Sequence, residues 1–308
     1  MCGIVGYIGE KDATTIILDG LKKLEYRGYD SAGIAVIENG KIQVRRSAGK
    51  LEKLVASVNE YPLEAKIGIG HTRWATHGVP STRNAHPHTG ATGKVVLVHN
   101  GIVENYLELR EELESEGVVF KSDTDTETIV HLVEKFMAMG NNLVSALRLC
   151  LRELKGAHGV VVLSSEEPDK IVAARIGNAG GVVVGYGKEE MFVASDIPAI
   201  LEHTRKMSFL ESHQIAIIYK DHIRFENLEG DEVRVAMHSI SWDRIPHALR
   251  QQDPLVRTQS HLLRQGRPVH HSADHGSQTL GCAEQIHVLA DETAIRGWIE
   301  NPVRFRHR

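Results

Sequence analysis

The 308-residue sequence is poor in cysteine and contains no long apolar run. Cys2, Cys150 and Cys282 lie far apart and form neither a C-x-x-C pair nor a disulfide framework, which favours a reducing compartment. No apolar stretch approaches the roughly 18 residues that a membrane helix requires, and no signal peptide is visible. We therefore expect a cytoplasmic protein without a membrane partner.

A basic run is also absent, because the lysines and arginines are dispersed and the net charge is -4. This balance gives no indication of a nucleic-acid partner. A hydrophobic content of 42% with 25% charged residues is typical of a globular chain that buries a core. The length favours two domains.

The composition changes near the end of the chain. No lysine follows Lys220 and no tyrosine follows Tyr219, while seven histidines fall between residues 240 and 308. Apolar periodicity is poor in the same span. We place a boundary near Ser239, which gives a folded domain at 1–239 and an atypical segment at 240–308.

Hydrophobic periodicity in residues 1–239 predicts a mixture of strands and helices. Strands are expected at 4–8, 33–38, 41–46, 67–70, 95–99, 160–164, 171–174, 182–185, 191–194, 215–219 and 222–225. Helices are expected at 14–25, at 106–116, and after a capping box at 124–127 (TDTE). Asn39-Gly40 predicts a type I′ hairpin turn. This order favours an α+β layered domain over a βαβ repeat.

The Met1-Cys2 start places a thiol one cleavage away from the first position. Removal of Met1 would leave Cys2 with a free α-amine, whose pKa of about 7.7–8.0 makes it partly neutral at pH 7. The amine can then take the thiol proton directly or through one water molecule. Taken alone, the dipeptide is better explained by a chance cysteine at the start of a buried strand.

Two polar segments follow the expected strand at 67–70. In the first, Arg73 suits a carboxylate, which it can grip with two parallel N–H bonds, and Trp74 can wall a pocket. A structural turn is the alternative. In the second, His86-Pro87-His88 suggests metal ligands, yet no carboxylate or cysteine stands at a recognised ligand spacing. Hydrogen-bonded structural histidines are the better interpretation.

Asn100-Gly101 follows the strand at 95–99. A side-chain amide beside a backbone N–H can donate to a developing oxyanion, although the same dipeptide is also a common turn. Asp123 and Asp125 precede a helix, where capping is the usual role and binding of a ligand amine is the alternative.

Six of these segments occur in an order that resembles one enzyme family. They are CGIVG (2–6), LEYRGYDSAG (24–33), HTRWATHG (71–78), NAHPH (84–88), VHNGI (98–102) and TDTE (124–127). Residues 2–243 resemble the glutaminase half of glutamine–fructose-6-phosphate aminotransferase (isomerizing). The resemblance implies a four-layer αββα N-terminal-nucleophile fold, with two antiparallel sheets between helical layers.

The resemblance also implies catalytic roles. Cys2 would attack the side-chain amide of glutamine and form a glutamyl thioester. Asn100 and the Gly101 N–H would hold the oxyanion. Arg27 would help to position the N-terminal residue.

Substrate binding is implied for a second set of residues. Arg73 would bind the α-carboxylate of glutamine and Asp125 its α-ammonium group. Trp74, Thr76 and His77 would line or close the pocket. No cofactor and no metal are expected, and L-glutamine is the expected substrate.

The isomerase half of that family is not recognisable in residues 244–308. Fructose 6-phosphate is therefore expected as a partner only if an isomerase half is supplied elsewhere. The tail has the composition of a truncated or frame-shifted reading, or of a novel tail on a short paralogue. A homodimer is compatible with the sequence. A non-catalytic glutamine-binding or partner-subunit module is the alternative function.

Overall fold

The computed structural model describes residues 2–74 and 78–241. The described helices are α1 (Ala13–Leu24), α2 (Leu51–Glu60), α3 (Tyr106–Ser115), α4 (Thr126–Ala138) and α5 (Leu143–Glu153). The strands are β1 (Gly3–Gly9), β2 (Ser31–Glu38), β3 (Lys41–Ala48), β4 (Ile67–Arg73), β5 (His88–Thr89), β6 (Val95–Gly101), β7 (His158–Ser164), β8 (Ile171–Ile176), β9 (Val183–Tyr186), β10 (Glu190–Ala194), β11 (Lys206–Phe209), β12 (Gln214–Ile218), β13 (Ile223–Asn227) and β14 (Met237–Ser239).

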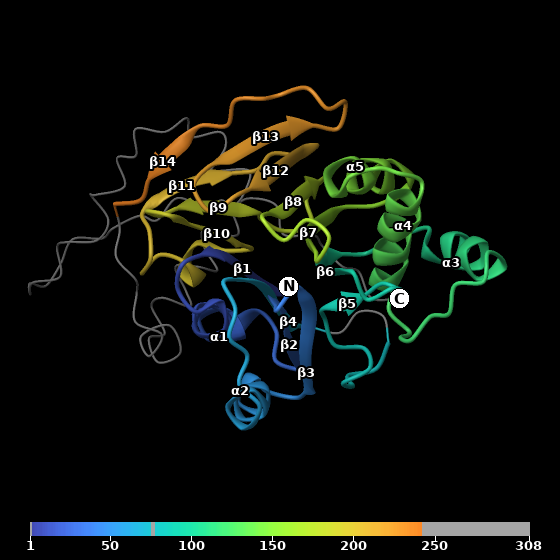
Figure 1. Ribbon diagram of the computed structural model, residues 1–308, viewed down its shortest axis with the longest axis horizontal. Coiled ribbons are helices and arrows are strands. Elements are labelled where there is room, and N and C mark those ends of the chain that lie inside the picture. The colour runs from blue at the N-terminus through green and yellow to red at the C-terminus, as the bar shows by residue number, and fades with distance from the viewer. Residues whose placement is uncertain (1, 75–77, 242–308) are drawn as a thin grey trace, which may run out of the picture. The chain divides into compact units, whose positions relative to one another are not determined.

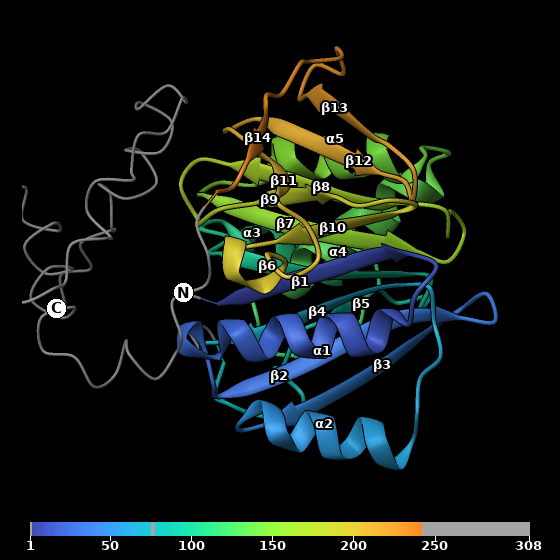
Figure 2. The same cartoon turned by 90° about the vertical axis from the view of Figure 1, so that its left-hand side faces the viewer.

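These strands form two antiparallel sheets. An eight-stranded sheet has the order β14-β11-β9-β10-β1-β4-β2-β3, and a six-stranded sheet has the order β13-β12-β8-β7-β6-β5. Helices α1 and α2 cover the outer face of the larger sheet, while α4 and α5 cover the outer face of the smaller one (Figures 1 and 2). The four layers confirm the predicted α+β, αββα architecture.

The alternation of side chains along β1 shows why the sheets stack in this way. Val5 and Tyr7 pack under α1, whereas Ile4 and Ile8 join Val98 in the layer between the sheets. Both faces of the strand are therefore apolar, and its seven residues are all buried. Full burial of one such side chain stabilises the fold by about 1.5–3 kcal/mol, so β1 is anchored along its whole length.

Strand register brings the start of β1 to the end of β4. Gly3 pairs with Thr72 on β4, and Ser31 of β2 pairs with Arg73 on the other side of the same strand. Cys2 consequently lies level with Arg73. The candidate nucleophile and the candidate carboxylate-binding residue thus share one end of the larger sheet.

The Asn-Gly hairpin prediction is confirmed. Asn39 and Gly40 have φ values of 50° and 73°, as a type I′ turn requires, and they join β2 to β3 in register. The sequence interpretation missed α2, α5 and the short strands β5, β11 and β14.

The capping-box prediction at 124–127 is wrong. Helix α4 begins after Asp125, whose side chain does not cap it. The hydroxyl of Thr124 instead contacts His88 Nε2 at 3.0 Å, and Glu127 accepts hydrogen bonds from the N–H groups of Lys121 and Ser122. These partners lie outside the local motif, so the four-residue pattern did not reveal them.

Strand β14 closes one edge of the larger sheet by pairing with β11. Residues 242–308 lie outside the described residues, so the boundary near Ser239 and the character of the tail stay predictions. Within residues 2–74 and 78–241, no helix is both long and apolar enough to cross a membrane.

Candidate active site

The thiol of Cys2 lies at the end of the larger sheet and is half-buried. Its Sγ accepts a hydrogen bond from the Trp74 N–H at 3.1 Å. Burial raises the pKa of the Cys2 thiol above its ordinary value, although the Trp74 hydrogen bond opposes the shift. A thiol in this setting is mostly protonated at neutral pH and needs a base before it can attack a carbonyl carbon.

The carbonyl oxygen of Cys2 accepts two side-chain hydrogen bonds. Arg27 Nε and Asn100 Nδ2 each donate to it over 3.2 Å. Arg27 is buried, and an ion pair with Asp196, with Nη1 and Oδ2 2.7 Å apart, holds its guanidinium in place. A Cβ at Gly28 would lie 2.6 Å from the carbonyl carbon of Arg73, so the turn carrying Arg27 packs directly on the end of β4.

Asn100 and Gly101 end β6 of the smaller sheet. Gly101 has φ +134°, and a Cβ there would lie 2.1 Å from the Ala157 carbonyl oxygen. Only glycine fits this backbone without displacement. The Asn100 amide is held at both ends, since Oδ1 lies 3.1 Å from His71 Nε2 while Nδ2 bonds Cys2.

Arg73 and Asp125 carry opposite charges that act on each other, and both residues are buried. Arg73 Nη2 donates to the Gly78 carbonyl at 3.1 Å, and Asp125 Oδ2 accepts from the Val103 N–H at 2.8 Å. Burial lowers the pKa of the Arg73 guanidinium, and the negative charges of Asp30 and Asp125 counteract that effect. A guanidinium can bind a carboxylate and a carboxylate can bind an ammonium group, which are the two charged groups of an amino acid.

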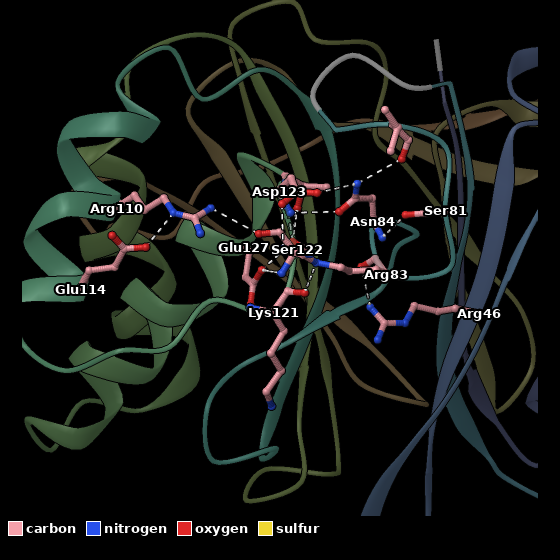
Figure 3. A network of polar contacts seen from close by, with 12 residues as sticks. Arg46, Ser81, Arg83, Asn84, Arg110, Glu114, Lys121, Ser122, Asp123 and Glu127 are labelled. Carbon is pink, nitrogen blue, oxygen red and sulfur yellow. Dashed lines mark hydrogen bonds and ion pairs between the residues drawn. The ribbon is translucent and has the colours of Figure 1, made fainter.

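A polar network joins the chain beyond Arg73 to the chain before Asp125 (Figure 3). Fully buried Asn84 donates to the carbonyl of Val79 at 3.1 Å and to Asp123 Oδ2 at 3.2 Å, and it accepts from the Asp123 N–H at 2.9 Å. Arg83 adds an ion pair to Asp123 at 2.8 Å. The sequence interpretation gave Asn84 no such role, because its partner Asp123 stands 39 residues away.

Glu127 supports the same segment from within α4. Its carboxylate accepts from the N–H groups of Lys121 at 2.7 Å and Ser122 at 2.6 Å, and it lies 3.4 Å from His131 Nε2. Burial alone would raise the pKa of Glu127, but these hydrogen bonds hold it at about 2. The ionised carboxylate therefore fixes the turn that leads to Asp125.

Five of the six buried histidines among the described residues lie between and beside the sheets, and we call these five the buried histidine cluster. Its members are His71, His86, His88, His99 and His158. Burial lowers the pKa of each member, to about 3 for His71 and His88 and to about 4 for His158. The structural interpretation of His86 and His88 is confirmed, because His86 Nδ1 accepts from the His99 N–H and His88 Nε2 bonds Thr124.

Within the part of the chain that the structure describes, no group of three His, Cys, Asp or Glu side chains is arranged to hold a metal.

Trp74 is 51% exposed and its ring meets Tyr29 edge-on, with centroids 5.8 Å apart. The predicted pocket residues Thr76 and His77 lie outside the described residues.

Two antiparallel sheets between helical layers, with a cysteine at the start of a central strand, define the N-terminal-nucleophile class of amidotransferases. Two solved structures agree with this class. The glutamine phosphoribosylpyrophosphate amidotransferase from B. subtilis, complexed with ADP and GMP, matches with a TM-score of 0.66 and 22% identity over 87% of this chain and 59% of that chain. A structure titled the allosteric regulatory enzyme of purine biosynthesis matches with a TM-score of 0.64 and 25% identity over 74% of this chain and 49% of that chain.

The family model described as "Glutamine amidotransferase domain" matches residues 43–229, and the chain belongs to that family. Similar curated proteins are glutamine–fructose-6-phosphate aminotransferases (isomerizing). The protein from Pyrococcus horikoshii is 49% identical over 243 residues, which is 79% of this chain and 40% of the relative. The protein from Thermus thermophilus is 48% identical over 242 residues, 79% of this chain and 39% of the relative. The chain thus spans about two fifths of the length of the curated relatives it matches.

Proposed function

We propose that this chain hydrolyses L-glutamine to L-glutamate and ammonia through a thioester on Cys2. The proposal rests on one observation. The carbonyl oxygen of Cys2 accepts hydrogen bonds from Arg27 and Asn100, while its Sγ accepts one from the Trp74 N–H. This arrangement holds the thiol beside an amide donor that comes from the facing sheet.

In the first step, removal of Met1 frees the Cys2 amine, which takes the thiol proton. The thiolate attacks the side-chain amide carbon of glutamine, and the carbonyl oxygen becomes an oxyanion. The Asn100 amide has two hydrogens, so it can bond Cys2 with one and the oxyanion with the other, beside the Gly101 N–H. Loss of one oxyanion donor typically costs about 10²–10³ in kcat.

In the second step, the protonated amine gives its proton to the departing nitrogen, and ammonia leaves. The same amine, again neutral, takes a proton from water, which attacks the thioester. Glutamate departs and the thiol is restored. Arg73 binds the α-carboxylate and Asp125 the α-ammonium group, with Trp74, Thr76 and His77 lining the pocket.

We extend the proposal to the context of this domain. Fructose 6-phosphate becomes the ammonia acceptor only where an isomerase half is supplied elsewhere. The domain is proposed to occupy 1–239, with a separate segment at 240–308, a cytoplasmic location and a homodimer as one assembly. The non-catalytic alternative is disfavoured because a glutamine-binding module has no need of the Cys2 thiol.

The test begins with intact mass, which reports whether Met1 is absent. Glutamate and ammonia are then measured for the wild type, for Cys2→Ala and for a chain with an uncleavable N-terminal extension. We expect release from the wild type alone, because an extended chain has an amide in place of the amine base. Full turnover by the extended chain would contradict the role of the amine. With fructose 6-phosphate added, ammonia without glucosamine 6-phosphate is expected.

A further inference from the structure

We propose that His71 is a positioning residue that fixes the side-chain amide of Asn100, so that its NH2 group faces Cys2 and the oxyanion. The inference deepens the proposed function and rests on it for the kinetic arm of its test. His71 does not contact the thiol itself. It acts through a single side chain that does.

The contact crosses from one sheet to the other. His71 lies within β4 of the larger sheet, opposite Ile4 of β1 and Gly33 of β2. Asn100 ends β6 of the smaller sheet. His71 is fully buried, and its Nε2 lies 3.1 Å from Asn100 Oδ1 and 3.2 Å from the His99 carbonyl oxygen.

The second of these neighbours, the His99 carbonyl, decides the tautomer of His71. The His99 carbonyl can only accept a hydrogen bond, so Nε2 must carry the hydrogen. Burial lowers the pKa of His71 to about 3, which keeps the ring neutral and leaves Nδ1 as a lone pair. Nδ1 accordingly has no hydrogen-bond partner among the described residues.

The tautomer in turn decides the orientation of the Asn100 amide. With Oδ1 toward the Nε2–H of His71, the NH2 group faces the Cys2 carbonyl at 3.2 Å. Rotation of the amide by half a turn would set its NH2 against an N–H donor. It would also set Oδ1 against the Cys2 oxygen. Both favourable contacts would become repulsive, and the oxyanion would lose a donor.

The ring of His71 is itself held in place. It stacks on the ring of His86 with centroids 4.2 Å apart and an interplanar angle of 26°. His86 is anchored because its Nδ1 accepts from the His99 N–H at 3.4 Å. The imidazole plane is therefore set by packing, and Nε2 is directed at Asn100 before substrate arrives.

A positioning role predicts a loss in kcat rather than in glutamine binding. His71→Phe keeps a flat ring and removes the donor, whereas His71→Gln keeps an N–H. We expect His71→Phe to lower kcat about 10- to 100-fold, below the full cost of a missing oxyanion donor. KM for glutamine should change less than about twofold, because the contacts that bind the substrate and the transition state equally well are unchanged. His71→Gln should restore most of the loss.

The decisive measurement is a double-mutant cycle with Asn100→Ala. If His71 acts through Asn100, His71→Phe should cost almost nothing further in the Asn100→Ala background. His88→Gln is the matched control, since His88 is equally buried but bonds Thr124. Its effect should add to that of Asn100→Ala. Equal losses from His71→Phe in both backgrounds would overturn the proposal.

A second measurement is independent of activity. Two-bond ¹⁵N–¹H spectra of the histidine-labelled wild type, assigned with His71→Gln, report which ring nitrogen carries the proton. A neutral Nε2–H tautomer at His71 is expected, and an Nδ1–H tautomer would refute the inference even in an active enzyme. If the wild type releases no glutamate, the proposed function fails, and the tautomer alone decides the role of His71. The same spectrum decides it if His71→Phe does not fold.

Discussion

The buried histidine cluster makes the folded state sensitive to mild acid. Each member has a pKa below its ordinary value in the folded chain because burial disfavours the imidazolium. In the unfolded chain each returns to about 6.5. Unfolding therefore takes up protons below pH 6.5. The contribution of the cluster to the free energy of unfolding has its full value above that pH and falls as the pH drops.

The size of the effect follows from proton linkage. Between pH 6.5 and 5.5, His71, His88 and His158, whose pKa values in the folded chain are about 3 to 4, each reduce the free energy of unfolding by about 1 kcal/mol, or about 3 kcal/mol together. By pH 4.5 the loss from these three reaches about 7 kcal/mol, comparable with the typical total stability of about 5–15 kcal/mol, and His86 and His99 act in the same direction. We expect cooperative acid unfolding between about pH 5.5 and 4.5, well above the range in which most carboxylates are protonated.

Urea denaturation at a series of pH values from 7.5 to 5 would measure this slope. His86→Phe and His158→Phe should each remove about one proton from the uptake on unfolding. His213→Phe is the control, because the His213 side chain is exposed. A free energy of unfolding that stays constant from pH 6.5 to 5 would refute the reasoning, since it would mean that the cluster is protonated in the folded chain.

Two further predictions concern substrate binding. Loss of one charge-assisted contact costs about 1.5–3 kcal/mol, so Arg73→Ala should lower kcat/KM for glutamine by about one to two powers of ten. A substrate analogue without the α-carboxylate should be a poor substrate for the wild type but should lose little further activity in the variant. An equal loss in the wild type and the variant would rule out the pairing of Arg73 with the α-carboxylate. Asn84→Asp sets an oxygen against the Val79 carbonyl and the Asp123 carboxylate. Thermal unfolding should therefore show that the free energy of unfolding falls by about 1–3 kcal/mol, and KM for glutamine should rise more than kcat falls. An unchanged melting temperature would contradict the contact.

Local pattern was sufficient for several elements that carry their own signal, although the apolar stripes of α2 and α5 were overlooked. Asn39-Gly40 specifies its turn through backbone conformation alone, and the apolar run at 4–8 needs no partner to be recognised as a strand. Strand β5 has two residues and β14 has three. Such short strands exist only because a neighbouring strand offers hydrogen bonds, so periodicity could not predict them.

The same distinction holds for the site. Cys2, Arg27, Arg73 and Asn100 were identified from motifs that resemble a family, and the structure sets all four around one end of the larger sheet. The contacts that orient these side chains could not be predicted from the sequence. His71 and Asn100 stand 29 residues apart on different sheets, and no local spacing links an imidazole to an amide across that gap.

The proposed mechanism gives the carbonyl oxygen of Cys2 a structural role. In that mechanism Cys2 uses its amine as the base and its thiol as the nucleophile, and the thiol contacts the backbone of Trp74. The carbonyl oxygen of Cys2 takes no part in the chemistry, so it can serve as an anchor for the fold. An oxygen with two lone pairs accepts two donors, and Cys2 receives Arg27 from one side and Asn100 from the other. Because Asn100 is also the proposed oxyanion donor, the bond that anchors the nucleophile sets the distance between nucleophile and oxyanion site.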